Sequence, residues 1–65
     1  MDLSYIFLCL RPDGVEAHLD VMVAESETQL RVHAQKMLRE HRSCDRVEVW
    51  RDAVCVLMLS REVTA

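Results

Sequence analysis

The sequence predicts an α+β fold with the element order β-β-α-β-β, a four-stranded mixed sheet with one helix on one face. Three observations carry this prediction. Residues 6–10 and 53–59 are apolar on both faces and are typical of strands, residues 11–14 (Arg-Pro-Asp-Gly) have strong turn chemistry, and residues 27–41 have a helical period. A single helix covers only one face of such a sheet, so the other face is expected to be open.

The first hairpin is predicted from residues 3–10, the turn at 11–14 and an alternating return strand at 15–23. Pro12 presets φ, and Gly14 can take the left-handed conformation that closes a three-residue loop. Such a loop would put two sets of side chains together on the helix side of the sheet. These are Tyr5, Phe7 and Cys9 of the first strand and Ala17, Leu19, Val21 and Val23 of the second.

One amphipathic helix is expected over about residues 27–41. Ser26 and Gln29 fit a capping box, in which each side chain accepts a hydrogen bond from a free amide at the helix start. At 100° per residue one arc is apolar, and Val32 falls outside it, among polar residues. The residues of the arc are Leu30, Ala34, Met37, Leu38 and His41.

The second hairpin is predicted from residues 46–50, a tight turn at Arg51-Asp52 and residues 53–59. With a two-residue loop, the residues on the helix side would be Val47, Val49, Val54, Val56 and Met58. A right-handed crossover makes the second and third strands parallel. Numbered in chain order, the strands are expected as 2-1-4-3, with the doubly apolar strands in the centre, and 2-1-3-4 is the alternative.

The composition indicates one small domain spanning residues 1–65. A chain this short buries only about 60% of the surface that its unfolded form exposes, so oligomerisation is a common way to add stability. The net charge of −3 disfavours general affinity for nucleic acid or an anionic membrane. The apolar runs are too short to span a bilayer.

Three cysteines, Cys9, Cys44 and Cys55, lack the spacing of a disulfide framework. They are interpreted as reduced, buried thiols of a soluble protein in a reducing cytoplasm.

The open sheet face is the main functional prediction. Its apolar stripe is expected to comprise Ile6, Leu8, Leu10, Cys55, Leu57 and Leu59, with His18 and Trp50 at its borders. An apolar stripe with a polar rim is typical of an interface. The sequence therefore predicts a non-enzymatic module, a homodimer or an adaptor for a protein partner, with no cofactor and no membrane.

Two other classes of function have weaker sequence support. His41 and Cys44, with His33 or His18, could serve a small metal- or ligand-binding module, but a zinc site needs three or four converging ligands. Binding of nucleic acid would use the basic helix residues Arg31, Lys36, Arg39 and Arg42, which are interleaved with Glu40 and Gln35 as on a solvated helix surface. Acid–base catalysis by His18 and Asp20 would need a pocket and a nucleophile.

Three segments resemble one family of very small proteobacterial proteins of unknown function. They are Leu10-Arg11-Pro12-Asp13-Gly14, Glu25-Ser26-Glu27 and Val47-Glu48-Val49-Trp50. The resemblance implies a hairpin-helix-hairpin pattern and no activity. The family usually has glycine in the second turn, where this chain has Arg51-Asp52.

Overall fold

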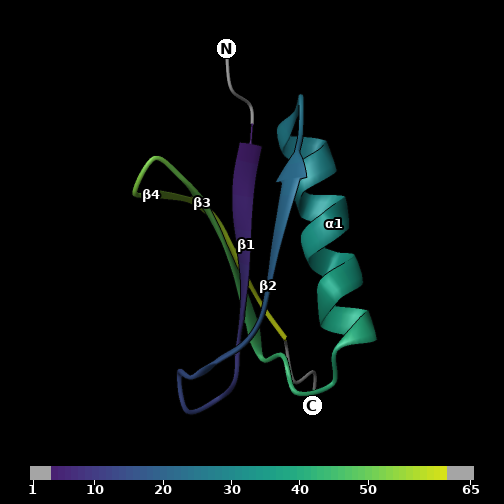
Figure 1. Ribbon diagram of the computed structural model, residues 1–65. Coiled ribbons are helices and arrows are strands. Elements are labelled where there is room, and N and C mark those ends of the chain that lie inside the picture. The colour runs from purple at the N-terminus through teal and green to yellow at the C-terminus, as the bar shows by residue number, and fades with distance from the viewer. Residues whose placement is uncertain (1–3, 62–65) are drawn as a thin grey trace.

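The computed structural model describes residues 4–61 and contains the five expected elements in the expected order (Figure 1). They are β1 (Ser4–Leu10), β2 (Glu16–Val23), α1 (Glu27–Glu40), β3 (Arg46–Arg51) and β4 (Val54–Ser60). Leu3, the predicted start of the first strand, lies outside the described residues. The α+β class is thus confirmed.

The sheet has the order β2-β1-β3-β4, the second of the two expected orders. All neighbouring strands are antiparallel, so the sheet is not mixed. Since β2 and β3 both run antiparallel to β1, they are parallel to each other, as the crossover rule predicts. β4 is apolar on both faces but lies at an edge, because the helix buries its apolar arc against the valines of β3 instead.

The first turn has the predicted three-residue loop, but the register changes directly after it. Gly14 has a φ of +86°, and its N–H donates to the carbonyl of Arg11 at 2.8 Å. Leu10 lies opposite Glu16, whereas Cys9 lies opposite His18, so Ala17 is an extra residue in a β-bulge. One extra residue turns the rest of a strand over. The predicted facing of β2 was therefore wrong: its open-face residues are Leu19, Val21 and Val23, and its helix-side residues are His18, Asp20 and Met22.

The second hairpin shows the same effect. Its turn is Asp52-Ala53, one residue later than predicted, and both residues have positive φ, 51° and 65°. Trp50 then lies opposite Cys55, whereas the preceding Val49 lies opposite Leu57, which makes Val56 the extra residue of a second bulge. Cys55, before the bulge, has the predicted facing, but the residues after it do not: Leu57 and Leu59 pack against the core, and Met58 points to the open face.

The core joins the two central strands to one face of α1. Its fully buried sheet residues come from β1 and β3, and Leu30, Ala34 and Met37 of α1 cover them, as the helical arc predicted. The sheet residues are Phe7, Cys9, Val47 and Val49. At about 25 cal/mol per Å² of apolar surface, this burial is the main stabilising contribution.

Two cysteines of this core form a disulfide, which corrects the prediction of free thiols. Cys9 in β1 is bonded to Cys44 in the loop after α1, with 5.3 Å between the Cα atoms, and both residues are fully buried. Cys55 is free and exposed. Three cysteines without framework spacing gave no sign of the pair, because residues 35 positions apart meet only when α1 folds back over the sheet.

Both ends of α1 are capped. At the start, Ser26 Oγ accepts from the amide of Gln29 at 3.3 Å, and Gln29 Oε1 accepts from the amide of Glu25, one residue before the position expected. At the end, the Arg61 guanidinium donates to the carbonyls of Leu38, His41 and Cys44. The last carbonyls of a helix lack partners within it. Arg61, the residue after β4, supplies a donor to one of them, the carbonyl of Leu38.

Candidate functional site

The sheet face opposite α1 is uncovered in the part of the chain that the structure describes (Figure 1). Directly opposed residues of antiparallel strands point to the same face, so the registers define two rows of side chains across it. One row, from β2 to β4, is Val21, Ile6, Trp50 and Cys55. The next row is Leu19, Leu8, Glu48 and Met58.

The open face is strongly apolar for a surface. Ile6, Leu19, Val21, Val23 and Met58 are each between 43% and 65% exposed. With the partly exposed Leu8 and Trp50 they form a contiguous apolar patch of roughly several hundred Å², the size at which a patch on a monomer is often functional. A patch of this size marks a candidate interaction surface.

The single acidic group of the two rows is neutralised within the face. Glu48 Oε2 lies 3.2 Å from Nε of Arg46, and its Oε1 accepts a hydrogen bond from Trp50 Nε1 at 3.1 Å. Only 18% of the Glu48 side chain is exposed. A carboxylate with two such partners can be covered by an apolar partner at a lower desolvation cost than an unpaired one. The row beyond it is Glu16, Leu10, Arg46 and Ser60; Leu10 is nearly buried, so the exposed groups of this row are polar.

The predicted interface residues divide between the two faces. Ile6, Leu8, Trp50 and Cys55 lie on the open face as expected. Leu10 has the same facing but is only 9% exposed, so it offers little surface. Leu57, Leu59 and His18 lie on the helix side and are removed from the site.

Four open-face residues were missed by the sequence prediction: Leu19, Val21, Val23 and Met58. Their alternation marks them as members of one apolar face, but it does not say which face. The bulges at Ala17 and Val56 decide this, and neither position has a turn residue that would signal a bulge.

The histidines pair between β2 and α1. The rings of His18 and His41 stack with centroids 4.4 Å apart, and Nε2 of His33 lies 2.9 Å from Oδ2 of Asp20. The hydrogen bond with His33 lowers the pKa of Asp20 below its ordinary value. These contacts join the edge strand β2 to the helix.

The candidate metal ligands do not converge. Cys44 is in the disulfide and His41 stacks on His18, while His33 is paired with Asp20. Between residues 4 and 61 no cluster of three or more His, Cys, Asp or Glu side chains could hold a metal ion. On the basic helix surface, Arg31 lies 3.8 Å from Glu27, which offsets its charge.

Comparison with protein-family models, curated proteins and solved structures finds no match to this chain. The resemblance to small proteobacterial proteins therefore stays a prediction. Within residues 4–61 no helix has the length and apolar character needed to cross a membrane.

Proposed function

We propose that this chain is a non-enzymatic module that self-associates through its open sheet face, with two copies packed face to face. The observation that supports this most is the pair of side-chain rows, which leave about half of each of several large aliphatic side chains in solvent. Two sheets packed in this way lie about 10 Å apart and interdigitate their inner side chains.

A second copy of the chain is the partner that best fits the charge of this face. Glu48 is already paired with Arg46, so the rows present no unbalanced charge for an oppositely charged partner. An identical apolar face meets this condition, and two-fold dimers pair one patch with itself. A standard interface uses about 800 Å² per partner, so the proposed contact includes the polar rim as well as the apolar rows.

The same proposal includes an adaptor or regulatory role in a bacterial cytoplasm, as the sequence predicts. Disulfides are rare in that compartment, so Cys9 and Cys44 would be held there as a dithiol. Both residues are buried and neither is part of the open face.

The test is sedimentation equilibrium of the wild type and two matched valine variants at micromolar concentrations. Val21 on the open face and Val32 on the helix are both 57% exposed. Val21→Lys is expected to weaken dimerisation at least about tenfold, because it places a charge against an apolar surface. Val32→Lys is expected to leave the dimer intact, and thermal melts confirm that both variants fold. A monomeric wild type, or equal effects of the two variants, overturns the proposal.

A further inference from the structure

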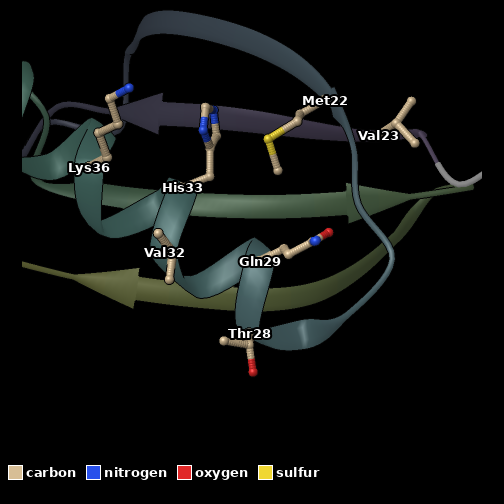
Figure 2. A pocket seen from close by; sticks show the side chains of 7 residues that line it. All are labelled: Met22, Val23, Thr28, Gln29, Val32, His33 and Lys36. Carbon is tan, nitrogen blue, oxygen red and sulfur yellow. The ribbon is translucent and has the colours of Figure 1, made fainter.

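A groove lies on the other side of β2, between this strand and α1. Its volume is about 510 Å³, within the range of small-molecule sites. Figure 2 shows its lining side chains, which come from the end of β2 and from successive turns of α1. They are Met22, Val23, Thr28, Gln29, Val32, His33 and Lys36; Val23, the last residue of β2, also belongs to the open face.

The groove results from where the helix packs. α1 lies against β1, β3 and β4, and it reaches β2 only through side-chain pairs such as Asp20–His33. The edge strand and the helix therefore stand apart along the N-terminal half of α1, and the groove fills this space with apolar walls.

One wall of the groove is a ridge along α1 formed by Thr28, Val32 and Lys36, at a spacing of four residues. Residues at this spacing lie above one another on a helix. Val32 is the residue that fell outside the predicted apolar arc; it is 57% exposed and contributes nothing to the core. Its place in the groove gives this apolar side chain a role on an otherwise polar surface.

The polar groups of the groove differ in what they are free to bind. Gln29 Oε1 accepts from the Glu25 amide, and His33 Nε2 is occupied by Asp20. Lys36 forms no ion pair with any residue from 4 to 61. The groove thus combines an apolar wall with the ammonium of Lys36, which is unpaired among residues 4–61 and lies toward the C-terminal end of α1.

We infer that the groove binds a monocarboxylate with an unbranched apolar chain, a medium-chain fatty acid. Its carboxylate would pair with the Lys36 ammonium, and its chain would lie along Val32 and Met22 toward Thr28. The ridge from Lys36 to Thr28 is about 12 Å long at about 1.5 Å per residue, which suits a chain of medium length. A doubly charged phosphate suits the site less, because among the described lining residues Lys36 is the only lysine or arginine, and Asp20 adds negative charge beside His33.

The experiment is a titration of the isotope-labelled protein with octanoate, followed by amide NMR. Octanoate is expected to shift the signals of Met22, Val32 and Lys36 and to saturate at millimolar concentration. Lys36→Gln is expected to weaken octanoate binding at least about fivefold, since it removes a charge-assisted contact. Arg31→Gln, on the same helix but outside the groove, is the matched control and should bind like the wild type.

A neutral probe and a cationic probe of the same chain length test whether binding requires a negative charge. 1-Octanol should bind more weakly than octanoate, and octylamine more weakly still, because Lys36 repels it. The inference is overturned if octanoate shifts no groove signals, if the Lys36→Gln variant binds equally well, or if octanol equals octanoate. Val32→Asp should abolish octanoate binding in a protein whose other amide signals keep their positions, which separates loss of the site from loss of the fold.

Discussion

The central strands and the outer strands of this sheet obey different rules. In β1 and β3 the side chains face as their sequences predict: Phe7 and Val49 point to the helix, and Ile6 and Trp50 point away. In β2 and β4 one extra residue each, Ala17 and Val56, reverses the expected facing of the residues that follow it. Packing against α1 therefore determines which way the side chains of β1 and β3 face. In the edge strands β2 and β4, a single β-bulge determines it.

The burial of the strands gives the physical reason. A slip in β1 or β3 would move fully buried side chains into solvent, at about 1.5–3 kcal/mol for each large one. In β2 no residue is buried, and on its helix side Asp20 and Met22 are only half-buried, so turning the strand over costs less than in β1 or β3. Because turning over an edge strand costs less, aliphatic side chains of β2 are found on the open face.

The largest expected effect concerns the disulfide that fixes the centre. Cys9 and Cys44 are 35 positions apart, and closing a loop of this length stabilises a fold by about 3–4 kcal/mol in the chain-entropy model. Urea unfolding with and without a reducing agent measures it. The Cys55→Ser variant serves as the background, because it removes the free thiol. Equal stability of the two forms would show that the helix holds the centre without the covalent link.

The second effect compares one valine from each class of strand. Val49→Ala in β3 removes a fully buried side chain and is expected to lower the free energy of unfolding by about 2 kcal/mol. Val21→Ala in β2 is expected to change it by less than about 0.5 kcal/mol, because the residue is 57% exposed. The free energies of unfolding are measured by urea unfolding of the monomer. Equal decreases for the two variants would contradict the division between central and edge strands.

The smallest effect concerns the turn that leads into β4. Ala53 has a φ of 65°, a left-handed conformation that is unfavourable by about 1–2 kcal/mol for residues with a Cβ. Ala53→Gly is therefore expected to raise the free energy of unfolding by up to about 1 kcal/mol, the remainder being lost to glycine's freedom in the unfolded chain. In the control Ala17→Gly, at a position without positive φ, stability should fall. If Ala53→Gly also loses stability in thermal melts, the outer hairpin is not strained.

The sequence was sufficient for the elements, the first turn and the cap at Ser26, because these depend on local chemistry. It was insufficient for the facing of Leu57 or Val21, because a bulge is set by contacts across the strands and not by a residue type. The alternative strand order was correct because β3 is the more buried strand of its hairpin. Arg61 was missed as a helix cap because it lies 20 positions from the carbonyl of His41.

The cap made by Arg61 ties the completion of the helix to the order of synthesis. α1 leaves the ribosome about twenty residues before Arg61 does. The carbonyls of Leu38 and His41 therefore gain this donor only after β4 has been made. In a nascent chain that lacks the arginine, the amide of His41 can already bond to the carbonyl of Met37, but the carbonyl of Leu38 has no such donor. The Arg61 hydrogen bonds at the end of α1 therefore form only after β4 has been synthesised.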